Sequence, residues 1–170
     1  NLIGEHTDHT GGRCLPMAVT MGVTVTGERG GHRVRLTSDQ EAGVADVPLD
    51  VDDPAAASPG WARYVAGVVA VLQPSEGFVG EVRADLPVGA GMSSSAALEV
   101  AVALALGHDG DVVSLARTCQ EAEHVASGVP CGILDQLSSA AGRAGHAFVL
   151  DCHTLERSYV PVPDDIAVRA

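Results

Sequence analysis

The first polar stretch of the chain places several reactive side chains within five positions. Glu5, His6, Asp8 and His9 lie between glycines, a composition typical of a loop or turn. Carboxylate and imidazole groups this close together suit three interpretations: a solvated turn, a metal site, or a site for the hydroxyl groups of a polyol such as a sugar. The spacing of His6, Asp8 and His9 matches no standard zinc signature, which argues against the metal site.

A glycine- and serine-rich stretch at residues 87–97 suits the binding of phosphate. It follows a strand-like run at residues 78–86 and precedes an apolar helix that we expect to extend to about Leu106. A helix that begins beside a glycine loop presents unpaired N–H groups and the positive end of its dipole to an anion. The loop lacks the lysine of a Walker A motif, and all ten basic residues of the chain are arginines. The alternative is an ordinary glycine-rich turn ahead of a core helix.

A carboxylate on the apolar side of a predicted helix stands out further along the chain. The helical period over residues 111–127 places Cys119, Ala122 and Ala126 on one stripe, and Glu123 falls in the middle of that stripe. An inward carboxylate must be paired, protonated or bound to a cation. A buried salt bridge is one interpretation, and a ligand for Mg²⁺ near the phosphate loop is the other.

A second carboxylate, Asp135, lies in a short helix that follows a Gly/Pro turn at residues 128–132. The helical period places Asp135 opposite a stripe formed by Ile133, Leu137 and Ala140. From the residues alone, Asp135 is therefore predicted to be a surface or capping residue.

The elements that position these groups alternate between strands and helices. We expect a strand at residues 17–27 that pairs with a second strand at residues 33–38 across a glycine turn. Residues 39–59 are acidic and rich in Ala and Pro, which predicts an exposed connection. Further elements are a helix at residues 60–72, a strand at residues 146–151, and another strand that begins near residue 159.

Composition excludes several classes of function. A net charge of −12 argues against nucleic acid or an anionic membrane as a partner, and no apolar run is long enough to span a bilayer. The four widely spaced cysteines form no C-x-x-C pair, which favours a reduced, cytoplasmic protein. At 170 residues the chain can form one domain, but both ends begin or stop within strand-like runs, so we expect a piece of a longer protein.

Three stretches, taken in order, resemble the galactokinases of the GHMP small-molecule kinase family. Residues 1–8, NLIGEHTD, are similar to the galactokinase signature. Residues 87–97, PVGAGMSSSAA, are similar to the shared phosphate loop. The third stretch combines residues 120–124, QEAEH, with residues 131–136, CGILDQ. The resemblance covers nearly the whole chain, and its first stretch is specific to the sugar-1-kinase branch.

The resemblance implies a role for each matching residue. Glu5, His6 and Asp8, with the backbone of Gly132, would bind the sugar hydroxyls, and Asp135 would act as the general base or orienting acceptor at the anomeric hydroxyl. Ser95 and Glu123 would hold Mg²⁺. The ATP phosphates would be wrapped by a continuous segment: Gly89, Ala90, Gly91, Met92, Ser93, Ser94 and Ser95.

The family also implies a fold and an activity. The fold is a two-layer α/β (α+β) arrangement, with residues 1–170 forming the N-terminal domain, truncated at both ends and without the C-terminal domain. The activity is phosphorylation of galactose at C1 by MgATP, although the fragment alone is expected to be inactive. Alternatives are a kinase for N-acetylgalactosamine or another sugar, a non-catalytic sugar sensor, and a metal-dependent hydrolase built on His6, Asp8 and His9. The sequence does not indicate an oligomeric state.

Overall fold

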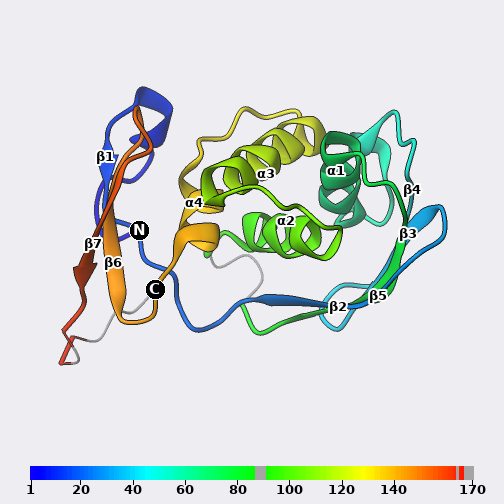
Figure 1. Cartoon of the computed structure of the whole chain (residues 1–170), viewed down its shortest axis with the longest axis horizontal. Coiled ribbons are helices and arrows are strands. Elements are labelled where there is room, and N and C mark those ends of the chain that lie inside the picture. Colours follow the sequence, from blue (N-terminus) through cyan, green and yellow to red (C-terminus); the bar gives the residue numbers. More distant parts are fainter. Residues whose placement is uncertain (87–90, 164, 167–170) are drawn as a thin grey trace.

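A computed structural model describes residues 1–86, 91–163 and 165–166 (Figure 1). Two β-sheets flank a layer of helices, so the predicted mixed α/β class is confirmed. The strands are β1 (Arg13–Cys14), β2 (Val23–Arg29), β3 (Arg33–Ser38), β4 (Val44–Pro48), β5 (Phe78–Ala84), β6 (His146–Asp151) and β7 (Arg157–Pro161). The helices are α1 (Ala62–Leu72), α2 (Ser94–Ala105), α3 (Val112–Ser127) and α4 (Leu134–Ala141), with short 3₁₀ turns at Asp8–Thr10 and Pro54–Ala56.

The larger sheet has the strand order β2-β5-β3-β4, with β5 antiparallel to β2 and parallel to β3. The predicted hairpin between residues 17–27 and 33–38 is therefore wrong, because β5 lies between its two strands. The glycine turn between β2 and β3 instead pairs with the residue before β5. The N–H of Gly30 donates to the carbonyl of Gly77 at 2.8 Å, and the N–H of Gly77 donates to the carbonyl of Gly31 at 2.9 Å. Alternation of side chains predicted both strands, although β2 begins only at Val23 and residues 17–22 lie outside it, but alternation could not specify the partner of either strand.

The predicted exposed connection at residues 39–59 is also wrong in part. It contains β4, which pairs with β3 at the edge of the sheet and buries Ala45 and Val47 completely or almost completely. The neighbouring 3₁₀ turn buries Pro54. This short strand was missed because Ala45 carries little apolar signal, Val44 on the outer face is apolar, and acidic residues flank the segment.

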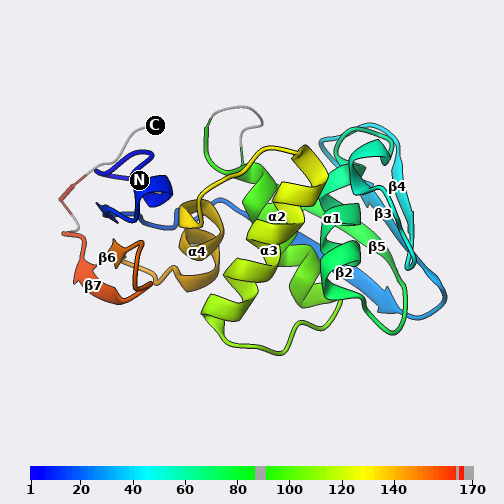
Figure 2. The same cartoon turned by 90° about the horizontal axis from the view of Figure 1, so that it is seen from above.

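Helices α1 and α2 pack against one face of the larger sheet, and α3 packs against both of them (Figures 1 and 2). Small side chains allow close packing: a Cβ on Gly67 of α1 would lie 2.3 Å from the carbonyl oxygen of Ala122 in α3. The core between the layers consists mainly of valine, alanine and leucine, including Val34, Leu36, Val47, Val65, Val68, Val69 and Val102. These helices agree with the predicted ones to within a few residues.

The smaller sheet has the order β1-β6-β7 and carries the N-terminal loop. Helix α4 lies between this sheet and the other helices (Figure 2). A second core cluster joins the two, with Phe148 and Leu150 of β6 packed among residues such as Leu134 and Leu137 of α4. The N-terminal loop is thereby brought beside the first turn of α4. Among the described residues, no helix combines the length and apolar character needed to cross a bilayer.

Candidate active site

The N-terminal loop is held in shape by Thr7. Its hydroxyl donates to the carbonyl of Gly4 at 2.6 Å, and its own carbonyl accepts the N–H of Gly12 at 2.8 Å. Gly4 has φ of 91°, and a Cβ there would lie 2.6 Å from the carbonyl oxygen of Arg13, so only glycine fits. His6 adopts φ of 59°, an uncommon conformation for a residue other than glycine. Such strained positions are concentrated at functional sites.

Asp8 fastens this loop to α4. Its Oδ2 accepts the backbone N–H of Leu134, the first residue of the helix, at 3.2 Å, and its Oδ1 accepts the N–H of His9 at 3.1 Å. Gly132 makes the approach possible, because a Cβ at that position would lie 1.7 Å from Asp8 Oδ2. Two residues predicted to bind sugar therefore meet, and Asp8 has a structural task as well.

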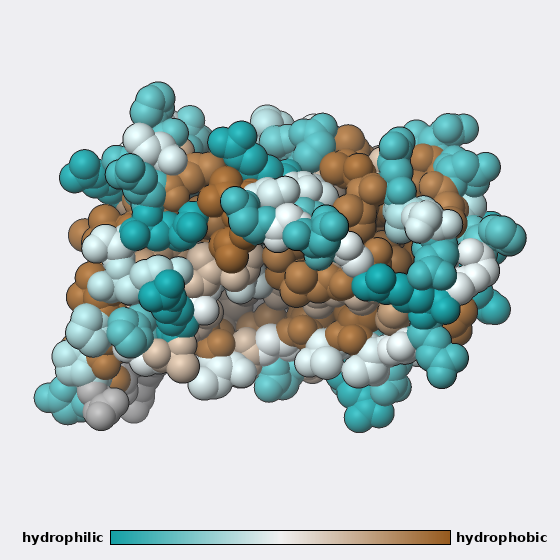
Figure 3. All heavy atoms as spheres, viewed as in Figure 1, coloured by the Kyte–Doolittle hydropathy of each residue, from teal (hydrophilic) through white to brown (hydrophobic). Residues whose placement is uncertain are grey.

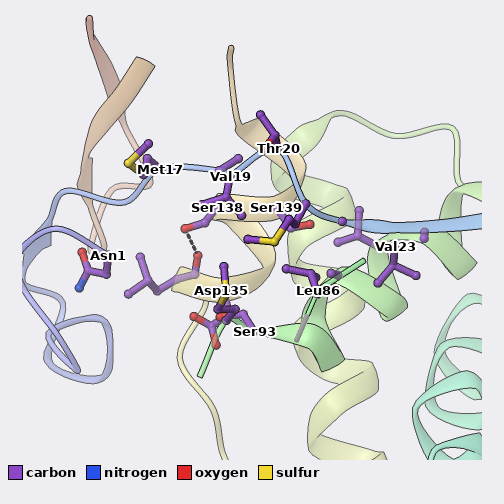
Figure 4. Close-up of a pocket in the computed structure, with 18 of the residues that line it drawn as sticks. Asn1, Met17, Val19, Thr20, Val23, Leu86, Ser93, Asp135, Ser138 and Ser139 are labelled. Atoms are coloured by element: carbon purple, nitrogen blue, oxygen red, sulfur yellow. Dashed lines mark hydrogen bonds between the residues drawn. The ribbon is translucent and has the colours of Figure 1, made fainter. Parts of the chain in front are cut away.

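Asp135 lies in the first turn of α4, close to the hydroxyl of Ser93 (Figure 4). The side chain reaches solvent, as expected for a surface residue, yet enough protein surrounds it to raise the pKa of its carboxyl group above the ordinary value. Burial is the largest cause of the rise; the Ser93 hydroxyl opposes it, and the charges of Glu123, Asp8 and Glu5 add to it. These effects show that residues predicted for sugar, metal and catalysis lie in one electrostatic neighbourhood.

The described part of the glycine–serine loop leads directly into α2. Gly91 has φ of 68° and Ser93 has φ of 55°. Ser93 occupies the N-cap position of α2 without making a side-chain capping bond, so its hydroxyl is available to Asp135. The predicted phosphate-binding residues Gly89 and Ala90 lie outside the described residues. Met92, Ser94 and Ser95 belong to the same entry into the helix, which is partly exposed.

Glu123 of α3 points inward, as the helical period predicted. Its Oε1 accepts the hydroxyl of Ser95 at 2.9 Å, and its Oε2 accepts Nε2 of Gln136 at 2.5 Å. No arginine among the described residues forms an ion pair with Glu123, which leaves the salt-bridge interpretation without support. A carboxylate and a hydroxyl are hard oxygen donors, and Mg²⁺ is commonly held by one or two protein groups together with phosphates and water. Ser95 and Glu123 therefore fit a magnesium ion.

The site includes two buried residues that the sequence analysis missed. Glu99 of α2 and Gln136 of α4 are both fully buried. The pKa of Glu99 is raised to about 9: burial is the largest cause, the charge of Glu123 adds to it, the hydrogen bond from Gln136 opposes it, and the charge of Asp135 contributes least. The signal was present in the sequence: Glu99 is the acidic residue of an otherwise apolar helix and follows Ser95 by one helical turn.

The turn that precedes α4 is anchored by two side chains of α3. Nε2 of Gln120 donates to the carbonyl of Cys131 at 3.1 Å, and Nε2 of His124 lies 3.0 Å from the same oxygen. In the sequence, both residues resemble the family only as parts of a longer motif. Because Cys131 precedes Gly132, these contacts help to hold Gly132 against Asp8. By contrast, no group of three potential metal-binding His, Cys, Asp or Glu side chains occurs in the described ranges, which leaves the hydrolase alternative unsupported.

These elements border a cleft of about 950 Å³. Asn1 and Glu5 line it from the N-terminal loop, Ser93 from the start of α2, and Asp135 from α4. Figure 3 shows a hollow near the middle of the corresponding face, bordered mainly by hydrophobic side chains. A cleft that combines apolar side chains with a few polar groups is typical of a small-molecule site.

Comparisons with known proteins show which protein family the chain resembles. Residues 63–143 match the model of the GHMP kinases N terminal domain, and residues 1–29 match the galactokinase galactose-binding signature. Human galactokinase is 41% identical over 96% of this chain, and the bovine galactokinase shows the same identity and coverage. The chain belongs to the GHMP kinase family. The resemblance found in the sequence is thus confirmed.

Solved structures of GHMP kinases show the same fold. Lactococcus lactis galactokinase complexed with galactose has a TM-score of 0.86 and 33% identity, over 96% of this chain and 45% of that structure. Methanococcus jannaschii mevalonate kinase has a TM-score of 0.68 at 16% identity over 96% of this chain and 53% of that structure, a likeness in fold alone. The chain spans about 45% of the length of the curated galactokinases it matches.

Proposed function

We propose that the protein carrying this chain is a galactokinase, which transfers the γ-phosphoryl group of ATP to the C1 hydroxyl of galactose. One observation carries the proposal: Asp8 binds the start of α4, which places Glu5 and Asp8 within electrostatic reach of Asp135. A galactose-binding signature therefore lies against a candidate base, and the base lies beside Ser93 at the end of the phosphate loop. The solved galactokinase complexed with galactose supports the choice of sugar.

Glu5, His6, Asp8 and the backbone of Gly132 are assigned to the sugar. Asp8 is oriented before any ligand binds, because both of its oxygens already accept backbone N–H groups. Each carboxylate oxygen has a further lone pair for a sugar hydroxyl. An oriented acceptor loses little conformational freedom on binding and rejects sugars whose hydroxyls point elsewhere. The geometry therefore favours a site that distinguishes galactose from glucose.

Asp135 is assigned as the base, or the orienting acceptor, for the C1 hydroxyl. The rise in its pKa makes the carboxylate a better proton acceptor than an ordinary aspartate. The neighbours responsible for the rise are Glu123, Asp8 and Glu5, all acidic. A cation brought to the site would lower the pKa again and favour the ionised form. The ionisation of Asp135 is thus expected to depend on what occupies the cleft.

The segment Gly89–Ser95 and the start of α2 are assigned to the phosphates of ATP, with Ser95 and Glu123 holding Mg²⁺. When bound, Mg²⁺ would neutralise charge on the phosphate oxygens. The chain itself contributes the N–H groups of a helix N-terminus and the hydroxyls of three serines. Phosphoryl transfer depends mainly on positioning and charge, so lysine is not required in the loop.

Four free cysteines support a cytoplasmic setting for the protein.

The test measures galactose-dependent ADP formation by a full-length protein carrying this chain, with glucose and N-acetylgalactosamine as competing substrates. We expect turnover with galactose and little with glucose. Equal rates on galactose and glucose would contradict the assignment of the sugar site. Turnover confined to N-acetylgalactosamine would identify a related kinase, and galactose binding without turnover would identify a sensor.

A further inference from the structure

A buried amide connects two carboxylates behind the proposed magnesium site. Nε2 of Gln136, on α4, donates to Oε2 of Glu123 on α3 at 2.5 Å and to Oε2 of Glu99 on α2 at 3.4 Å. Three helices therefore meet at one side chain. Glu123 in turn accepts the hydroxyl of Ser95 with its other oxygen, so the chain of contacts runs from the interior of the protein to the phosphate loop.

This arrangement leaves two oxygens without partners. Oε1 of Glu99 and Oε1 of Gln136 are buried and accept no hydrogen bond from any described residue. Both side chains are 0% exposed, and an ionised carboxylate with an unpartnered oxygen is costly in the interior. A proton on Glu99 removes this cost and adds a donor to the buried cluster. A neutral Glu99 also allows its partner Gln136 to sit between two acidic side chains without a cation.

We propose that Gln136 and Glu99 are positioning residues that hold the carboxylate of Glu123 toward Ser95 and the phosphate loop. The inference rests on the proposed function, because it gives Glu123 the metal-binding role assigned above. Without such a role, an apolar pair of the same volume would fill this interior at lower cost. Outer contacts of this kind set the orientation of a metal ligand and thereby the affinity for the ion.

Substitutions at the two positioning residues can keep or remove their hydrogen bonds while changing little else. Glu99→Gln keeps a neutral group that accepts from Gln136 and also provides a donor, so it should preserve the position of Glu123. Glu99→Met and Gln136→Met retain length and volume but remove the hydrogen bonds. Gln136→Asn keeps the amide on a shorter arm that cannot reach both carboxylates. Val102→Ala, in the buried core on α2, is the matched control for lost stability alone.

The experiment measures Mn²⁺ binding, in the presence of ADP, to the full-length protein by water-proton relaxation. Glu123→Gln defines the part of the binding that depends on Glu123. We expect Gln136→Met, Gln136→Asn and Glu99→Met to weaken that part by about tenfold or more. Glu99→Gln and Val102→Ala should stay within about threefold of wild type. Circular dichroism identifies variants that do not fold; Gln136→Asn and Glu99→Gln are the mildest and keep the comparison possible.

Wild-type affinity in both Gln136 variants would overturn the inference, as would equal weakening by Val102→Ala or the absence of any Glu123-dependent binding. A different result would refute the proposed function. If the variants behave as expected but galactose produces no ADP, the positioning role stands and the assignment of the reaction falls.

Discussion

Glu99→Gln should change how the stability of the protein depends on pH. Burial raises the pKa of Glu99 to about 9 from an ordinary value of 4.5. The folded protein therefore keeps the proton over a range in which the unfolded chain releases it. Stability from the neutral Glu99 is fully present below pH 4.5 and is lost as the pH rises toward 9. Glutamine cannot titrate, so the variant lacks this loss.

The magnitude follows from the proton that only the folded state binds. One proton changes the free energy of unfolding by about 1.4 kcal/mol per pH unit. Between about pH 5.5 and 7.5, wild type should lose about 3 kcal/mol relative to Glu99→Gln. Glu99 is fully buried, so solvent does not reduce the effect.

Urea unfolding of both proteins at about pH 5.5, 6.5, 7.5 and 8.5 measures the difference. Titrations elsewhere in the molecule cancel in the comparison of wild type with variant. A flat difference for Glu99→Gln would show that Glu99 is ionised in the folded protein, and the reasoning about its neutral form would be refuted.

Three further predictions concern the candidate active site. Asp135→Asn should reduce galactose-dependent ADP formation by about a thousandfold while calorimetry still detects galactose binding; near-normal turnover would remove Asp135 from the reaction. Gly132→Ala should cost about 1–3 kcal/mol of stability and raise KM for galactose, because its Cβ would overlap Asp8. Gly60→Ala is the control: a Cβ at Gly60 meets nothing within 4 Å, so this variant should change neither stability nor KM. Glu123→Gln should weaken turnover and its Mg²⁺ dependence far more than it alters Tm; unchanged activity with a higher Tm would instead assign Glu123 to structure alone.

Much of the helical framework could be predicted from the sequence because local signals specify it. The stripe on α3 placed Glu123 inward, and the glycine–serine loop marked the start of α2. Strand partners could not be predicted in the same way. A period of two defines the faces of β2 and β3 but carries no information about the strand that separates them.

The site was only partly predictable for a related reason. Helical period placed Asp135 on the surface, and the side chain is indeed exposed. Its place beside the N-terminal loop arises from contacts between distant parts of the chain, such as Asp8 with Leu134, which lie 126 positions apart. The family motifs supplied those roles instead. Gln136 was overlooked because a buried amide next to a candidate catalytic residue has no periodic signature.

The pairing of β1 with β6 has a consequence for folding during synthesis. Arg13 and Asp151, which face each other across this pair, are separated by 138 positions. On the ribosome, the N-terminal loop emerges before the larger sheet, whereas its supporting strand β6 emerges after that sheet and all four helices. The larger sheet needs nothing beyond Ala84, so it can assemble much earlier. A nascent chain halted before β6 should therefore hold a formed helical layer while its first 14 residues remain open to chaperones and proteases.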